Sequence, residues 1–145
     1  MLQRPLKDVL RHQHLCYLPM TATVRSAAAE MARRHIAAVL VVDEEDNLRG
    51  IFTERDVLDR VMMASRDPDA TSLSEVMTHD PVTIDASQPV RNCIAELKAN
   101  DVRHMPVLDG DTLIGIVSMR DFLADEIAEL DHERDHAQII WETLR

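Results

Sequence analysis

One stretch of sequence occurs twice in this chain, and the repeat limits the possible folds more than any other feature. Residues 50–58 read GIFTERDVL and residues 115–123 read GIVSMRDFL, with identical residues at five of the nine positions. The similarity extends upstream to residues 24–31 and 90–97, at an offset of 66. Repeated units of this size usually cannot bury their apolar faces alone. A tandem pair therefore predicts two units that stack on one another through a shared core.

The two repeats predict the same order of secondary structure. Each begins with a short extended stretch and continues with a helix, because apolar residues recur at i, i+3, i+4 and i+7 across residues 24–31 and 90–97. Two apolar runs joined by an acidic turn predict a hairpin, and a helix beginning at Thr53 or Ser118 closes each repeat. Residues 64–72 are a polar linker. The expected strands are residues 16–18, 38–42 and 48–52 in the first repeat and residues 82–84, 105–108 and 113–117 in the second.

The composition limits the partners of the chain. Among 145 residues, 26 are acidic and 16 are basic, which gives a formal net charge of −10. Binding to nucleic acid or to an anionic membrane depends on clustered Lys and Arg, so we expect neither partner. Cys16 and Cys93 are too isolated for a disulfide framework or a zinc site. No apolar run fits a signal peptide or a membrane span, and a cytoplasmic protein is expected.

The strand-to-helix junction carries the same three residues in both repeats, Gly50, Thr53 and Asp56 in the first and Gly115, Ser118 and Asp121 in the second. A glycine in a strand lets another group approach the backbone, and a helix N-terminus attracts phosphate. The aspartate can accept hydrogen bonds from the vicinal hydroxyls of a ribose. The alternative is a capping box that closes the helix without any ligand. A cap does not require the glycine, however, and here the whole spacing occurs twice.

The chain resembles a tandem pair of cystathionine-beta-synthase (CBS) domains, often called a Bateman module. Besides the duplicated junction, the resemblance rests on residues 74–77 (SEVM), 80–84 (DPVTI) and 103–109 (RHMPVLD), and it covers about residues 6–126. It implies an α+β fold of two β-α-β-β-α units, residues 6–63 and 73–126, packed through their sheets about a pseudo-twofold axis. A C-terminal helical tail would occupy residues 127–145.

The resemblance also implies that an adenosyl ligand binds in two clefts between the units. In family members that bind such ligands, the junction hydroxyl residue holds phosphate, the junction aspartate holds the ribose, and the extended segment before the first helix contacts adenine. Two residues at the start of a strand, Arg103 and His104, are implied as phosphate contacts, with a solvated strand end as the alternative. The expected ligand-binding residues are Gly50, Thr53, Asp56, Val82, Thr83, Ile84, Arg103, His104, Gly115, Ser118 and Asp121.

The first repeat departs from the family pattern. It has HLCY at residues 14–17 where the second repeat has DPVT at residues 80–83, and AAVL at residues 37–40 where the second has RHMP at residues 103–106. The first repeat keeps the ribose and phosphate positions but lacks the polar lining. We therefore expect the two sites to bind unequally, with the second-repeat set of residues the stronger.

These features predict a stand-alone, non-enzymatic sensor without a catalytic cofactor. Its expected ligand is AMP, ADP or ATP, less readily S-adenosylmethionine or NAD, and it would report that ligand in trans to a regulated protein whose identity is unknown. A homodimer is expected, as is common for stand-alone members. The alternative is a constitutive interaction or scaffold dimer whose clefts are empty and whose junctions are only helix caps.

Two patterns mark the C-terminal tail. Residues 132–136 read HERDH, so His132 and His136 could ligate zinc with Glu133 as a general base. A convincing third ligand is missing and the neighbours are acidic, which favours a solvated helix face with no metal site. A seam of residues spaced by threes and fours, which ends in Trp141 and Leu144, predicts either a short coiled coil or docking of the tail on the protein.

Overall fold

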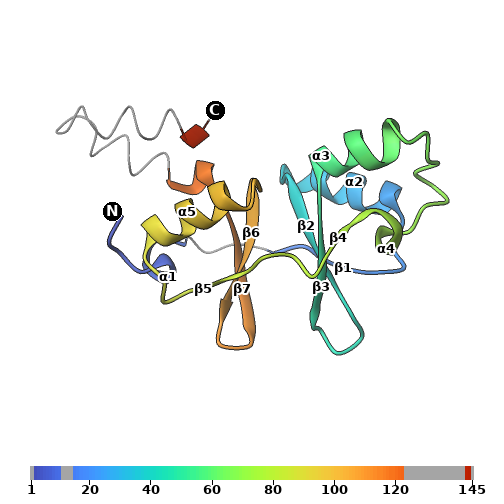
Figure 1. The fold of residues 1–145 in the computed structure, drawn as a ribbon. Coiled ribbons are helices and arrows are strands. Elements are labelled where there is room, and N and C mark those ends of the chain that lie inside the picture. Colours follow the sequence, from blue (N-terminus) through green and yellow to red (C-terminus); the bar gives the residue numbers. More distant parts are fainter. Residues whose placement is uncertain (1, 11–14, 123–142, 145) are drawn as a thin grey trace. The chain divides into compact units, whose positions relative to one another are not determined.

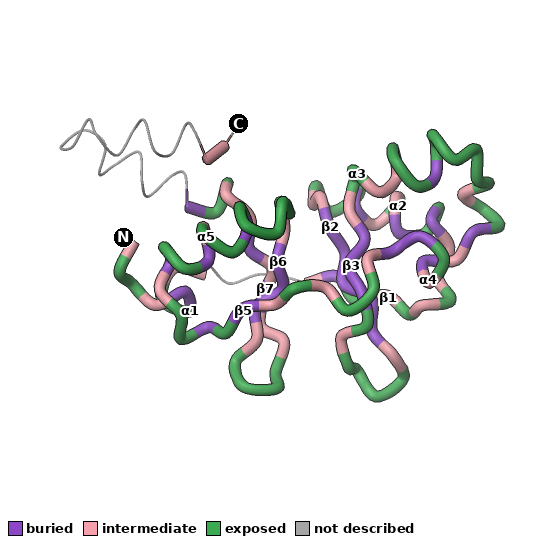
Figure 2. Tube along the Cα trace, viewed as in Figure 1, coloured by how far each residue is buried: buried purple, intermediate pink, exposed green. Residues whose placement is uncertain are grey.

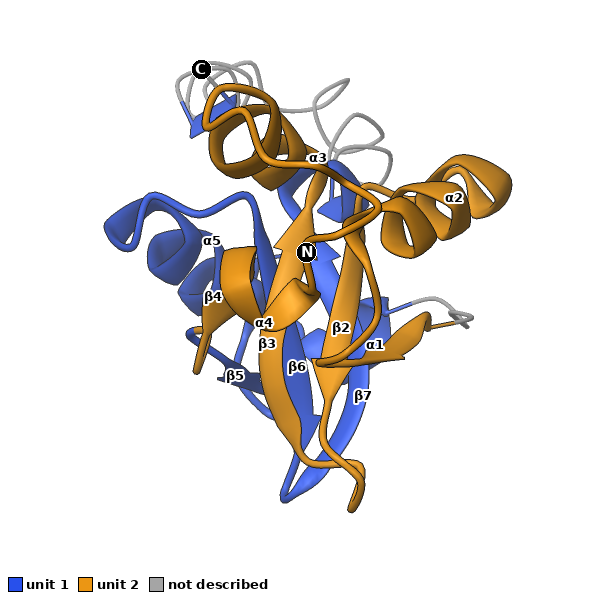
Figure 3. Ribbon diagram, turned by 90° about the vertical axis from the view of Figure 1, so that its right-hand side faces the viewer, with its two compact units in different colours: residues 1–13, 82–145 blue, residues 14–81 orange. Residues whose placement is uncertain are grey.

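The computed structural model describes residues 2–10, 15–122 and 143–144, which form two compact units. Unit 2 comprises residues 14–81 and contains the first repeat, and unit 1 comprises residues 82–145 together with residues 1–13 (Figure 3). The α+β architecture expected from the sequence is confirmed. No helix among the described residues is long and apolar enough to cross a bilayer.

Unit 2 is built on a four-stranded sheet in the order β1-β2-β3-β4 (Figure 1). Its strands are β1 (Tyr17–Pro19), β2 (Ala38–Val42), β3 (Leu48–Thr53) and β4 (Thr78–His79). β1 is parallel to β2, whereas β2, β3 and β4 are successively antiparallel. Its helices are α2 (Val24–Arg34), α3 (Glu54–Asp56), the π-helix η1 (Val57–Met62) that continues α3, and α4 (Leu73–Val76).

Unit 1 repeats this plan with a three-stranded sheet in the order β5-β6-β7. The strands are β5 (Ile84–Asp85), β6 (His104–Asp109) and β7 (Thr112–Ser118), with β5 parallel and β7 antiparallel to β6. The helices are α1 (Leu6–Val9) and α5 (Val90–Ala99), and residues 119–122 are also helical. The extended stretch expected at residues 82–84 becomes a strand only from Ile84, because the ladder to β6 begins there.

The helical periodicity of the sequence is confirmed by the core of each unit. α2 buries Val24, Ala27 and Met31, and α5 buries Val90, Cys93 and Leu97 at the matching positions. In unit 2 these side chains pack with Val39, Val41 and Phe52, and in unit 1 with Met105, Val107 and Val117. Figure 2 shows the buried stretches concentrated along the central strands. The strands are therefore held by the helix that precedes them in the same repeat.

Each unit is completed by a short helix that precedes the other repeat in the sequence. α1 lies beside α5 (Figure 1), where the Leu6 N–H donates to the Gln88 carbonyl at 2.8 Å. In unit 2 the Leu73 N–H of α4 donates to the Ala22 carbonyl, also at 2.8 Å. Both leucine side chains are fully buried. The two segments are structural equivalents, and each fills the core of the unit in which it lies.

Candidate functional site

The junction of unit 2 is a complete capping box at the end of β3. The hydroxyl oxygen of Thr53 accepts the Asp56 N–H at 3.3 Å. In return, Oδ2 of Asp56 accepts the Thr53 N–H at 2.9 Å and the Thr53 hydroxyl at 3.1 Å. The helix N-terminus is thus closed by the chain's own side chains, as the capping alternative requires.

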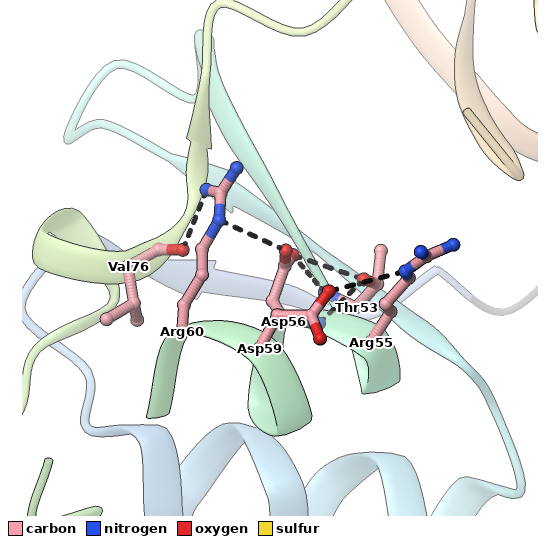
Figure 4. A network of polar contacts seen from close by, with 6 residues as sticks. All are labelled: Thr53, Arg55, Asp56, Asp59, Arg60 and Val76. Carbon is pink, nitrogen blue, oxygen red and sulfur yellow. Dashed lines mark hydrogen bonds and ion pairs between the residues drawn. The ribbon is translucent and has the colours of Figure 1, made fainter. Parts of the chain in front are cut away.

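The second carboxylate oxygen of Asp56 faces an arginine one helical turn further on. Oδ1 of Asp56 lies 3.5 Å from Nε of Arg60, and Nη1 of Arg60 donates to the Val76 carbonyl at 3.0 Å (Figure 4). The Asp56 side chain is 14% exposed and that of Arg60 is 46% exposed. A carboxylate offers about four lone-pair positions. The capping contacts use Oδ2, so Oδ1, the oxygen that faces the guanidinium, is the one left for hydroxyl donors.

Gly50 is required by the neighbouring strand of its own unit. It pairs with His79 of β4, and a Cβ built at Gly50 would collide with the sulfur of Met77 and lie 2.9 Å from the Thr78 carbonyl oxygen. The sequence indicated that some group approaches the backbone here. The approaching groups in this structure belong to residues 77 and 78, which accounts for the glycine without a ligand.

The junction of unit 1 has the same local plan in a more open setting. The Ser118 N–H donates to Oδ2 of Asp121 at 2.6 Å, and Asp121 is exposed. His104 pairs with Ser118 across the β6–β7 ladder, as Ala38 pairs with Thr53 in unit 2. Arg103, which is exposed, precedes His104 directly. The fold therefore places the two expected phosphate contacts next to the hydroxyl residue of the second repeat.

The segment expected to contact a base is only partly available. Ile84 is buried in the core of unit 1, where it packs with Val107 among others. Val82 is exposed and Thr83 is half-buried. Tyr17 occupies the position of Thr83 in the first repeat, and about half of its surface is exposed. Burial of the remainder, together with the nearby charge of Asp46, raises the pKa of its hydroxyl.

The structure adds residues that sequence reasoning did not single out. Arg60 contacts the junction aspartate, and the available signal was its i, i+4 spacing from Asp56 on a helix. Met77 packs against Gly50, and no local pattern announces that contact because the two are far apart in sequence. Arg60 aligns with Asp125 in the second repeat, so the charge at this position is reversed between the repeats.

The expectations for the tail fall outside the described residues. His132, Glu133, His136 and Trp141 all lie in the stretch that is not described. Within residues 2–10, 15–122 and 143–144, no three His, Cys, Asp or Glu side chains are grouped so that they could hold a metal ion.

Comparison with known proteins gives consistent matches. A profile of the CBS domain matches residues 6–63 and 73–126. The CBS domain-containing protein CBSCBSPB1 of Arabidopsis thaliana is 27% identical over 131 residues, which are 90% of this chain but only 24% of that protein. The chain thus spans about a quarter of the length of this curated relative.

Solved structures show the same fold. A putative signal-transduction protein with CBS domains from Burkholderia ambifaria is 36% identical with a TM-score of 0.75, and the match covers 81% of this chain and 85% of that one. The CBS domain protein PAE2072 from Pyrobaculum aerophilum, solved in complex with AMP, is 24% identical with a TM-score of 0.75 and covers 82% and 90%. The duplicated junctions, the two matched sheet units and the family profile together show that this chain belongs to the CBS domain family.

Proposed function

We propose that this chain is a non-enzymatic regulatory module that binds an adenosyl ligand such as AMP, ADP or ATP and reports it to a partner protein. The observation that carries the proposal is the duplicated junction, in which a hydroxyl residue opens a helix and an aspartate folds back onto it. A homodimer, ligand sites in clefts between the CBS units, and a regulated protein in trans belong to the same proposal.

Within each junction, different groups suit different parts of the ligand. The positive end of the helix dipole at each junction favours phosphate. The carboxylates of Asp56 and Asp121 can accept hydrogen bonds from ribose hydroxyls. In unit 1, Arg103 and His104 lie beside Ser118 and would add donors for phosphate. Val82 and Thr83 are the accessible candidates for contact with the base.

The AMP complex of the Pyrobaculum protein supports a ligand of this class, since the two proteins share a fold. ADP, ATP, S-adenosylmethionine and NAD carry the same adenosyl group as AMP, so the proposal extends to them.

A constitutive interaction module is the second candidate. It is favoured by the Thr53 capping box, which is complete without a ligand, and by exposed apolar side chains on η1 and at Met63, the residue after it. Leu58 is 54% exposed, Met62 67% and Met63 78%. Adjacent exposed apolar side chains of this kind often mark contact surfaces for other proteins.

A melting-temperature screen separates the two candidates. The purified chain would be heated with AMP, ADP, ATP, S-adenosylmethionine and NAD, with GMP and inorganic phosphate as controls for the base and the phosphate. A ligand present at about 100 times its Kd stabilises the folded state by about 2.7 kcal/mol. If no adenosyl compound raises the melting temperature or gives calorimetric heat at millimolar concentration, the interaction module becomes the better reading.

A further inference from the structure

We propose that Arg60 is a positioning residue that links the Thr53 junction to the segment leading into the other unit. We name residues 73–81 the connector, because they run through α4 and β4 and end where unit 1 begins at Val82. The part of this inference that concerns ligand rests on the adenosyl-binding function proposed above.

The guanidinium of Arg60 contacts both the junction and the connector. Its Nε lies 3.5 Å from Oδ1 of Asp56, and its Nη1 donates to the Val76 carbonyl at 3.0 Å. In Figure 4 the arginine side chain extends between these two groups. Val76 is the last residue of α4, so its carbonyl has no partner within that helix. Val76 is also only 2% exposed, and a buried carbonyl without a partner is costly.

The connector is held to β3 at the following residues. Thr78 and His79 pair with Ile51 and Gly50, and the Asp80 N–H donates to the Arg49 carbonyl at 3.0 Å. β3 itself ends at the junction residue Thr53. β3 thus ends in the junction and pairs with β4 of the connector. Arg60 adds a side-chain bridge between the junction and the connector, and this bridge depends on the charge of Asp56.

The second repeat cannot make this bridge. Arg60 aligns with Asp125 at the offset of 65 that relates the two junctions. An aspartate at this position carries no positive charge with which to pair with Asp121. The first repeat alone therefore has the arginine, which makes the Thr53 junction the one that acts on the connector.

A ligand at the Thr53 junction would compete with Arg60 for Oδ1 of Asp56. Oδ2 of Asp56 is engaged in the capping box, so ribose hydroxyls would donate to Oδ1, the oxygen that faces Arg60. A bound ribose would thereby displace the guanidinium and weaken its hold on the Val76 carbonyl. The expected consequence is a connector that opens more often when the Thr53 junction is occupied.

Hydrogen exchange of the ligand-free chain tests the bridge itself. Peptides covering residues 73–81 would be followed by mass spectrometry in the wild type, Arg60→Met and Arg60→Lys. Arg60→Met should speed their exchange about fivefold to tenfold, the effect of losing one hydrogen bond that contributes about 1–1.4 kcal/mol. In Arg60→Lys the exchange rate should lie between those of the wild type and Arg60→Met, because a single ammonium group cannot contact both partners as the guanidinium does. This variant also keeps the test valid if Arg60→Met folds poorly.

Arg55 offers a matched control on the same helical stretch. It pairs with Asp59 at 3.3 Å, and both side chains are well exposed. Arg55→Met should leave exchange of the connector within about twofold of the wild type, as expected for an exposed ion pair. Equal exchange in Arg60→Met and Arg55→Met would overturn the proposal.

AMP then tests the link to ligand, in an Asp121→Ala background that disables the Ser118 junction. AMP should speed exchange of the connector when Arg60 is present and leave it unchanged in Arg60→Met. The Kd for AMP should differ by no more than about tenfold between these two proteins. An equal response in both proteins would overturn the proposal, as would complete loss of AMP binding in Asp121→Ala when the wild type binds. If the wild type does not bind AMP, the proposed ligand is wrong, and the ligand-free comparison alone decides on the bridge.

Discussion

Equivalent residues of the two repeats differ in their surroundings. Asp56 is mostly buried, capped by Thr53 and faced by Arg60, whereas Asp121 is exposed and accepts the Ser118 N–H. Arg103 and His104 lie near Ser118 in unit 1, whereas Ala37 and Ala38 occupy the matching positions of the first repeat. The two equivalent aspartates would therefore bind a ligand together with different neighbouring residues.

Asp121→Ala and Asp56→Ala are expected to weaken binding of an adenosyl ligand unequally, with the larger loss for Asp121→Ala. Loss of a charge-assisted hydrogen bond costs about 1.5–3 kcal/mol, or roughly 10- to 150-fold in Kd. Titration calorimetry on each variant measures the change. The matched variants Asp121→Asn and Asp56→Asn keep an acceptor for the cap, and equal losses at both positions would contradict this expectation.

Asp43 is expected to make stability depend on acid pH. Hydrogen bonds, above all from the Asn47 N–H and also from the Asn47 and Arg49 side chains, hold the pKa of the Asp43 carboxyl below its ordinary value. A lowered folded-state pKa adds stability above the unfolded pKa of about 3.9 and loses it as pH falls through the folded value. Urea melts should show Asp43→Asn less stable than wild type at neutral pH, with the difference shrinking below about pH 4. A constant difference at all pH values would exclude this origin.

The two cysteines are expected to be inert in the folded protein. Burial, with a contribution from the Asp121 charge, raises the pKa of Cys93 to about 12, and burial also raises the pKa of Cys16. Both side chains are buried, and the thiolate is the reactive form. A chromogenic thiol reagent at neutral pH should label neither residue until denaturant is added. Rapid labelling of one thiol in native protein would show that its unit opens locally.

At the scale of secondary structure, the elements with a local signal could be predicted from the sequence. The helices over residues 24–34 and 90–99 follow from apolar spacing, and the paired strands β2–β3 and β6–β7 follow from apolar runs around acidic turns. The junction aspartates were also found in this way, because the motif occurs twice. In each case the residues that determine the structure lie within a few positions of one another.

The packing of elements that depend on distant contacts could not be predicted. α1 and α4 are four-residue helices whose position is fixed by packing on another segment. The S-x-x-E pattern of Ser72 and Glu75 was a usable signal for α4, since these residues form a capping box. No such signal marks the bridge from Arg60 to the Val76 carbonyl or the overlap that excludes a side chain at Gly50.

Gly50→Ala is expected to destabilise the pairing of β3 with β4. The added methyl group meets Met77 and lies 2.9 Å from the Thr78 carbonyl oxygen, and a backbone atom cannot move aside as a flexible side chain can. Overpacking of this kind costs about 1–3 kcal/mol. Chemical denaturation measures the loss, and Met77→Ala in the same chain should recover only the part due to the side chain. A Gly50→Ala protein as stable as wild type would contradict the close approach of β4.

At the scale of the whole molecule, two buried leucines should each stabilise the repeat other than the one that they directly precede in the sequence. Leu6 packs in the core around α5, and Leu73 packs in the core around α2. Replacing a fully buried leucine by alanine costs about 2–5 kcal/mol. Leu6→Ala should therefore raise hydrogen exchange in α5, and Leu73→Ala should raise it in α2. If each substitution instead loosened the other helix, the observed division of the chain into units would be wrong.

Because each short helix packs in the unit of the other repeat, the two units can be completed only in a fixed order during synthesis. Residues 14–81 contain all the segments of unit 2, so that unit can fold as soon as they have left the ribosome. Leu6 must wait for Gln88, which lies 82 positions further along. At translation rates of about 5–20 residues per second, this delay lasts several seconds. The α1 segment is synthesised before either repeat but is among the last to reach its place. During that interval Leu6, which is buried in the folded protein, is exposed to other contacts.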